Sequence, residues 1–133
     1  MSLAFWIDAP AKIVRLEYRG QVEVDDFTAA LEAVFRDPAY RPGFGFLVDR
    51  RAANPPTVDY TERVLAFALL HERELRGARW ALVVASAAAV DMGHFGEKLA
   101  ASAALPQAAQ VFRDPESAEA WLRVTALGPR GYP

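Results

Sequence analysis

The sequence predicts an α/β fold: a mixed, mostly parallel five-stranded sheet with an antiparallel N-terminal edge hairpin and about four helices. Residues 79–86, Arg-Trp-Ala-Leu-Val-Val-Ala-Ser, form a short, continuous apolar run, which is typical of a strand buried on both faces. Helical patterns flank this run on both sides, which favours a βαβ arrangement. Strand and helix patterns alternate in the order β-β-α-β-α-β-α-β-α, as in sheets with helical crossovers. We therefore expect residues 79–86 to form the central strand.

Length and composition predict one globular domain. The chain has 133 residues, of which 53% are hydrophobic and 24% are charged, which is the balance of a folded protein. We expect residues 1–127 to form a single domain. Residues 128–133 contain glycine and proline and are expected to form a flexible C-terminal tail.

Charge and cysteine content exclude several classes of function. The net charge of −2 offers no basic surface to nucleic acid, so no nucleic-acid partner is expected. The absence of cysteine excludes disulfides and thiolate metal sites, and it favours a reducing cytoplasm. No apolar run approaches the roughly 20 residues that a membrane span needs, so we expect no transmembrane segment and a cytoplasmic location.

The chain begins with the expected edge hairpin. Residues 4–7 are apolar and precede Asp8-Ala9-Pro10, a turn that confines them to an edge strand. Residues 12–19 alternate between charged side chains and a largely apolar set that includes Tyr18, which indicates a strand with one solvated face. Gly20 is expected to form a bend or bulge.

A helix and a buried strand follow the hairpin. Asp25 and Asp26 predict a helix start, because aspartate caps free amides and suits the positive end of the helix dipole. The apolar residues at helical spacing that form its buried stripe are Phe27, Leu31, Val34 and Phe35. Residues 44–49 are expected to form the next strand, with Asp49 at its C-terminal end.

The next segment is expected to be a loop followed by a long helix. Residues 50–58 contain Asn54-Pro55-Pro56, which disfavours both helix and strand pairing. The helix is expected to begin around Asp59 and to run to Arg76, with Gly77 just beyond its end. Asp59 would cap this helix, and Glu62 would complete a capping box.

Three further elements complete the predicted order. After a loop at 87–90, we expect a helix over about 91–103, a strand at 108–112 and a helix that begins at Asp114-Pro115-Glu116. The last helix has a buried stripe of Ala118, Trp121 and Leu122. Trp80 and Trp121 are both expected to lie in the core.

The segment 111–122, Val-Phe-Arg-Asp-Pro-Glu-Ser-Ala-Glu-Ala-Trp-Leu, resembles the C-terminal signature of the SpoIIAA-like family, relatives of the STAS domains of anti-sigma-factor antagonists. Arg19-Gly20 and Leu47-Val48-Asp49, both at strand ends, are also similar. The resemblance implies a SpoIIAA-like fold and a non-enzymatic binding or regulatory module of bacterial type. Such a module would bind a small apolar or anionic ligand, a lipid, or a protein partner.

The same resemblance makes Thr61 a candidate phosphorylation site. Phosphorylatable STAS proteins carry an Asp-Ser-Ser-Gly turn, and the matching turn here is Asp59-Tyr60-Thr61-Glu62. Thr61 falls at the hydroxyl position, but Glu62 replaces the glycine. We therefore expect a structural capping box and no phosphorylation switch.

Ligands of open parallel sheets bind beyond the C-terminal strand ends. The candidate ligand-binding residues at these ends are Asp49, Arg50, Arg51, Ser86 and His94. An alternative interpretation is a small hydrolase or transferase that uses the Ser86/His94 region, although Ser86 lacks the Gly-x-Ser-x-Gly elbow of such enzymes.

No catalytic residue is assigned. No cofactor or metal is predicted, because His71 and His94 lie on different elements, and His71 is expected to be half-buried beside one partner.

The helix expected to end at Arg76 also predicts self-association. Leu65, Leu69 and Leu70 lie away from its sheet-facing side, so the helix is apolar all round for two turns. An apolar patch surrounded by mixed charge is typical of a subunit contact. We therefore expect a homo-oligomer, most simply a dimer, through these leucines.

Overall fold

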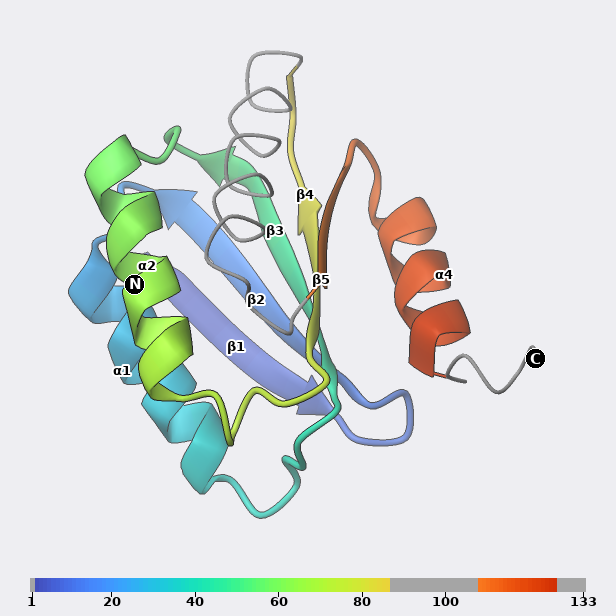
Figure 1. Cartoon of the computed structure of the whole chain (residues 1–133). Coiled ribbons are helices and arrows are strands. Elements are labelled where there is room, and N and C mark those ends of the chain that lie inside the picture. The colour runs from blue at the N-terminus through green and yellow to red at the C-terminus, as the bar shows by residue number, and fades with distance from the viewer. Residues whose placement is uncertain (1, 87–107, 127–133) are drawn as a thin grey trace.

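The computed structural model describes residues 2–86 and 108–126 (Figure 1). The helix expected over about 91–103 and the tail at 128–133 lie outside the described residues. The elements are β1 (Leu3–Asp8), β2 (Ile13–Gly20), α1 (Val24–Arg36), β3 (Gly45–Ala53), α2 (Val58–Leu70), β4 (Arg79–Val83), β5 (Ala108–Phe112) and α4 (Pro115–Ala126).

The five strands form one mixed sheet in the order β1-β2-β3-β4-β5. β1 pairs antiparallel with β2, and each later strand pairs in parallel with its predecessor, as the alternating pattern predicts. The prediction that residues 79–86 form the central strand is wrong. β3 is the central strand, and β4 is second from the edge. The apolar run indicates correctly that β4 is covered on both faces, but burial does not distinguish a central strand from its neighbour.

Helices cover both faces of the sheet (Figure 1). One core lies between the sheet and α1 and α2, and it includes Leu16, Phe27, Leu31 and Phe46. A smaller core lies on the other face, where α4 packs against β3, β4 and β5. Because successive side chains of a strand point to opposite faces, β3 and β4 contribute residues to both cores.

α1 and α4 agree with the sequence pattern. In α1, Phe27, Leu31 and Val34 are buried as expected, and the Asp26 carboxylate accepts a hydrogen bond from the Glu23 backbone N–H at 3.0 Å. The residue that caps α1 is therefore Glu23, and the predicted aspartates lie in the first turn, where Asp26 completes a capping box with Glu23. In α4, the predicted stripe residues Ala118 and Leu122 are buried.

The two tryptophans expected in the core are half-buried against it. Trp80 stacks on Phe46 with ring centroids 4.2 Å apart, in the larger core. Trp121 packs beside Phe112 with ring centroids 5.7 Å apart, in the smaller core. Each indole therefore keeps part of its surface exposed while its other side fills the core.

β3 extends four residues beyond the predicted end at Asp49. Pairing continues because β2 is equally long: Arg19 pairs with Ala52, Gly20 pairs with Ala53, and the Asn54 N–H donates to the Gly20 carbonyl at 2.8 Å. The register shifts between Glu17 and Arg19, so β3 contains a bulge here. The residues predicted as a loop, 50–53, are therefore part of a strand.

α2 differs from its prediction at both ends. Its cap is Thr57, whose side chain accepts a hydrogen bond from the Tyr60 N–H at 3.0 Å, so the predicted capping by Asp59 and Glu62 is wrong. The helix ends at Leu70, not at Arg76, and its C-cap is His71, whose backbone N–H is shared between the Phe67 and Ala68 carbonyls.

Beyond α2 the chain turns back toward the sheet. Leu75 is buried in the larger core, which holds this turn against the protein. Gly77, with φ of 76°, then leads into β4. The predicted place of Gly77 just beyond the end of the helix is therefore wrong, because Gly77 ends this turn and not α2.

Candidate functional site

The sheet separates the three adjacent candidate residues of β3. Asp49 and Arg51 point to the face that α4 covers, whereas Arg50 points to the face of α1 and α2. The sequence predicts the three as one group at the C-terminal strand ends. The structure places all three at this edge, but the side chains lie in two separate environments, one on each face of the sheet.

Asp49 and Arg51 satisfy one another. The Arg51 guanidinium donates from Nε to Oδ1 of Asp49 at 3.0 Å and from Nη2 to Oδ2 at 2.8 Å, and the Arg51 backbone N–H donates to Oδ1 at 3.0 Å. These hydrogen bonds from Arg51 lower the pKa of Asp49, although partial burial opposes the shift. The bidentate geometry neutralises both charges, which leaves little attraction for a charged ligand.

Arg50 lies against two tyrosine rings. Its guanidinium carbon lies 4.6 Å from the ring centroid of Tyr18 and 5.6 Å from that of Tyr60, within the range of cation–π interactions. Its Nη2 also donates to the Asn54 carbonyl at 3.0 Å. Across the described parts of the chain, Arg50 forms no ion pair with a carboxylate. Its half-buried guanidinium therefore has no carboxylate in direct ion-pair contact among those residues.

The two tyrosines form a pair that joins β2 to α2. Their hydroxyl oxygens lie 3.2 Å apart, and either can be the donor. Burial raises the pKa of Tyr18 well above its ordinary value. Burial also raises the pKa of Tyr60, although its hydrogen bond with Tyr18 and the charge of Arg50 oppose the shift. Both phenols are therefore neutral at physiological pH and can donate hydrogen bonds.

Sequence reasoning missed these tyrosines as site residues. The alternation of β2 placed Tyr18 correctly on the buried face, and Tyr60 was part of the turn compared with the STAS motif. The available signal was a hydroxyl at the end of an otherwise apolar stripe, since a buried phenol needs a polar partner.

The other candidate residues remain apart from this arrangement. Ser86 follows β4 and is exposed, while His94, the other residue of the alternative hydrolase or transferase site, lies outside the described residues. Near Ser86, Arg113 donates from Nη2 to the Ala85 carbonyl at 3.2 Å and so links the ends of β4 and β5.

Thr61 lies in the first turn of α2, close to the tyrosine pair. Its hydroxyl donates to the Thr57 carbonyl at 3.1 Å, and its side chain is half-buried. This local hydrogen bond gives Thr61 a structural role within the turn. That Thr61 is not phosphorylated remains a prediction.

His71 has the environment expected of a structural histidine. Its ring centroid lies 4.2 Å from that of Phe67 and 5.4 Å from that of Phe35. Its Nδ1 lies 3.7 Å from Oε1 of Glu74. Over residues 2–86 and 108–126, no group of three or more histidine, aspartate or glutamate side chains has an arrangement that could hold a metal ion.

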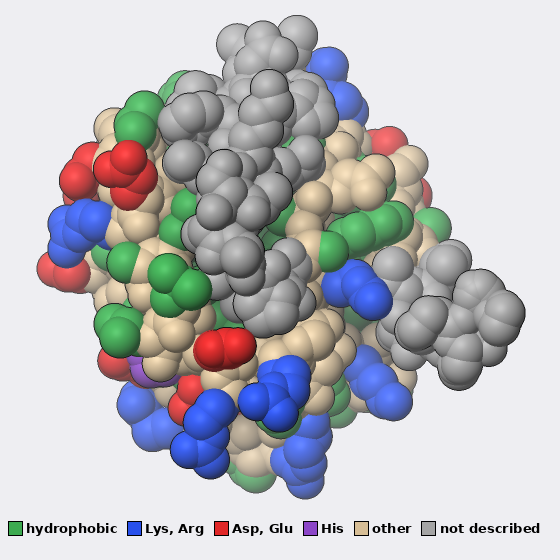
Figure 2. Space-filling view, in the orientation of Figure 1, with side chains coloured by type: hydrophobic (Ala, Val, Ile, Leu, Met, Phe, Trp, Pro, Cys, Tyr) green, Lys and Arg blue, Asp and Glu red, His purple; other side chains and the backbone are tan. Residues whose placement is uncertain are grey.

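The leucines predicted to mediate self-association are partly exposed. Leu69 is 49% exposed and Leu70 is 82% exposed, whereas Leu65 is half-buried. Figure 2 shows apolar side chains on the surface over α2, beside acidic and basic ones. The described surface thus has an apolar patch at Leu69 and Leu70, smaller than predicted because Leu65 is largely covered.

Comparison with known proteins relates the chain to a solved fold. No protein-family model matches the sequence, and no curated protein is similar to it. The structure is similar to the crystal structure of an uncharacterised protein of the DUF3478 family with a SpoIIAA-like fold from Shewanella loihica PV-4. The TM-score is 0.63 and the identity 17%, over 91% of this chain and 94% of the other. The chain has a SpoIIAA-like fold.

The SpoIIAA-like fold agrees with the resemblance carried by the C-terminal segment and with the predicted mixed sheet. At 17% identity the similarity concerns the fold alone. No helix in the part of the chain that the structure describes is long and apolar enough to span a membrane. A fold of this kind hosts different functions, and the function depends on the site residues themselves.

Proposed function

We propose that this protein is a non-enzymatic, STAS-like binding module that binds a small anionic ligand at the C-terminal edge of its sheet, with Arg50 as the residue that contacts the anion. The SpoIIAA-like fold supports the comparison with STAS modules. The observation that carries the proposal is the half-buried guanidinium of Arg50, which contacts two tyrosine rings and forms no ion pair with a carboxylate of the described residues.

The environment of Arg50 favours recognition of an anion. Withdrawing a cation from water costs free energy unless an opposite charge compensates it, and aromatic rings compensate only in part. A guanidinium has more N–H donors than the hydrogen bond from Arg50 to the Asn54 carbonyl uses. A carboxylate or phosphate would accept the remaining donors in bidentate geometry and would supply the missing charge.

The tyrosine pair holds this cation in place. Tyr18 comes from β2 and Tyr60 from the first turn of α2, so the guanidinium is fixed between a strand and a helix. Fixing an arginine before binding reduces the side-chain entropy that a ligand would otherwise have to overcome. Arg51, the next residue, is exposed and already paired with Asp49. The two neighbouring arginines therefore form a matched pair for a test.

Octanoate, which carries a carboxylate on an apolar chain, is a suitable probe, with octanol as its uncharged counterpart. We expect octanoate to bind more tightly than octanol in isothermal titration calorimetry. Arg50→Gln should weaken octanoate binding about tenfold or more, since hydrogen bonds to charged groups contribute about 1.5–3 kcal/mol. Arg51→Gln should leave it unchanged. Equal affinities for octanoate and octanol, or equal losses in the two variants, would contradict the proposal.

We also propose that the exposed Leu69 and Leu70 contact another copy of the chain. Both side chains lie in the last turn of α2, where charged residues of the following turn surround them. Exposed leucines grouped beside mixed charge are typical of subunit contacts. Leu69→Glu would place a charge in this contact and should therefore disrupt it.

A further inference from the structure

The free edge of the sheet at β1 is a second surface that fits another copy of the chain. Among the described strands β1 pairs only with β2, and α1 packs against it. Residues 3–7 of β1, Leu-Ala-Phe-Trp-Ile, contain neither a charged residue nor a proline. Edge strands are usually protected from pairing by such residues or by bulges. This edge of the sheet therefore remains available to a further strand.

The register of the hairpin shows which backbone groups face the free edge. The Arg19 N–H donates to the Ser2 carbonyl at 2.8 Å, so these residues form a hydrogen-bonded pair. Such pairs alternate along an antiparallel ladder, so Ala4 and Trp6 also direct their N–H and C=O groups toward β2. The N–H and C=O groups of the intervening residues, Leu3, Phe5 and Ile7, point away from β2.

We propose that β1 pairs antiparallel with β1 of a second copy, across a two-fold axis at Phe5. In this register Phe5 lies opposite Phe5 of the partner subunit, and Leu3 lies opposite Ile7 of the partner subunit. These are the residues whose backbone groups face outward, so all of them find partners. A shift by two residues in either direction would leave one of the outer residues unpaired. The two sheets would join into one continuous sheet.

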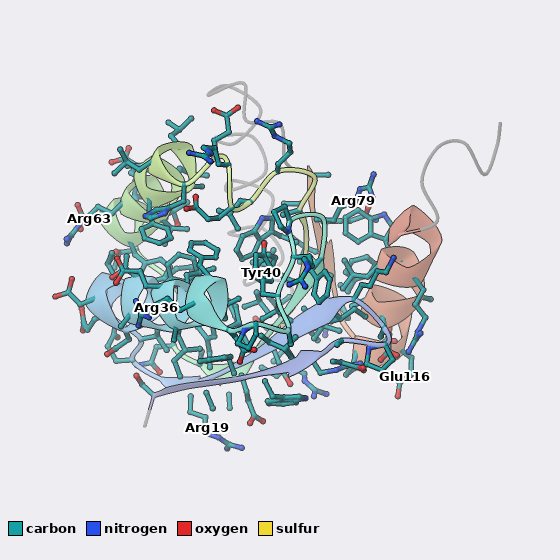
Figure 3. All side chains as sticks on the ribbon, turned by 90° about the horizontal axis from the view of Figure 1, so that it is seen from below. Arg19, Arg36, Tyr40, Arg63, Arg79 and Glu116 are labelled. Carbon is teal, nitrogen blue, oxygen red and sulfur yellow. The ribbon has the colours of Figure 1, made fainter. Side chains whose placement is uncertain are left out.

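The side chains of β1 fit the same register. Leu3, Phe5 and Ile7 pack on the α1 side of the sheet, so Ala4 and Trp6 lie on the opposite face, the side on which Figure 3 shows Arg19. Ala4 is exposed and Trp6 is 50% exposed. The proposed register places Ala4 opposite Trp6 of the partner subunit, a small side chain against a large one, with Cα atoms about 4.5 Å apart.

The charge of β1 is also compatible with this pairing. Asp8 is the one charged residue of the strand, and it lies at its end. The two-fold axis places the two Asp8 side chains at opposite ends of the ladder, about 20 Å apart at ~3.4 Å per residue. Their repulsion is therefore weak and screened by salt. The strand as a whole is complementary to itself.

Disulfide trapping tests the register, because the chain contains no cysteine. A mixture of Ala4→Cys protein and Trp6→Cys protein should form a disulfide-linked heterodimer under mild oxidation, detected by intact mass. Each variant alone should not cross-link at these positions, because identical residues would lie about 8 Å apart, beyond the ~7 Å that a disulfide can bridge. Homodimers of the single variants, or no cross-link in the mixture, would overturn the register.

The mass of the assembly tests whether the β1 edge forms a contact between subunits. The measurement is made on Leu69→Glu protein, in which the proposed α2 contact is disrupted. Light scattering should give a dimer for Leu69→Glu and a monomer when Phe5→Pro is added. Proline removes the outward N–H of Phe5 and leaves the ladder to β2 intact. Phe5→Val, which loses similar packing but keeps that N–H, should remain dimeric.

Circular dichroism and thermal melting confirm that each variant is folded. A monomeric Leu69→Glu protein would overturn the inference and leave α2 as the contact. A folded Phe5→Pro variant that remains dimeric would also overturn it. Because neither experiment involves Arg50, their results are independent of anion binding.

Discussion

At the scale of single residues, the pleat of one strand determines the chemistry of the candidate site. Asp49, Arg50 and Arg51 are adjacent in sequence, yet Arg51 neutralises Asp49 on one face while Arg50 contacts tyrosines on the other. Sequence analysis located the three residues at the correct edge of the sheet. It could not separate them, because it predicted a loop where the strand continues, and side chains in a loop do not alternate.

The pairing of Asp49 predicts a dependence of stability on pH. The folded-state pKa of Asp49 lies below its ordinary value of 3.8, so its contribution to stability is present above that value and is lost as the pH falls through the folded-state pKa. Asp49→Asn should lower the free energy of unfolding by up to about 1 kcal/mol at pH 7, since the pair is partly exposed. Urea unfolding at pH 7 and pH 3 measures the difference between the variant and the wild type.

This difference should become smaller at pH 3. Arg51→Gln should produce a similar loss at pH 7, and the double variant should lose little more, because both changes remove the same interaction. A difference that stays constant from pH 7 to pH 3 would show that the loss in Asp49→Asn has another cause.

At the scale of elements, the boundaries of α2 depend on contacts that a sequence pattern does not report. The helical periodicity was correct over most of its length, but the helix begins at a threonine cap and ends where the chain turns to bury Leu75. Asp59 and Glu62 satisfy the pattern of a capping box, yet Thr57 takes the cap two residues earlier. A side chain two positions away can compete for the same amides, and propensity alone does not decide between them.

The observed cap predicts a difference between two exposed residues. Thr57→Ala should lower the free energy of unfolding by about 1 kcal/mol, because it leaves the Tyr60 N–H without its acceptor. Asp59→Ala should cost only a few tenths of a kcal/mol, about the value of a carboxylate near a helix N-terminus. Chemical denaturation measures both. A larger loss in Asp59→Ala would restore Asp59 as the capping residue.

At the scale of the whole molecule, the order of elements could be predicted from the sequence and the order of strands could not. The alternation of strand and helix patterns correctly indicates a parallel sheet with an antiparallel edge, and the segment at 111–122 indicates the SpoIIAA-like fold. The central position of β3 depends on the edge of the sheet to which each crossover adds the next strand. The apolar runs of the sequence do not indicate that edge. The Arg50 site likewise depends on a contact between β2, β3 and α2 that exists only once the chain is folded.

The shared sheet predicts that the two cores unfold together. β3 and β4 carry residues of both cores, so loss of packing around α4 should destabilise the larger core as well. Trp121→Ala removes a half-buried indole beside Phe112 and should lower the free energy of unfolding by about 3 kcal/mol. For a domain of this size, that loss corresponds to a decrease in melting temperature of about 10 °C.

The tryptophans provide the measurement of this coupling. The chain has three, so Trp6→Phe combined with Trp121→Ala leaves Trp80, in the larger core, as the fluorescent reporter. Trp80 fluorescence and far-ultraviolet circular dichroism should report one coincident transition, because unfolding either face of the sheet exposes the strands that support the other. Trp6→Phe alone is the control for the shift in melting temperature. If circular dichroism changes before Trp80 fluorescence does, the α4 side unfolds separately, and the two faces do not form one cooperative unit.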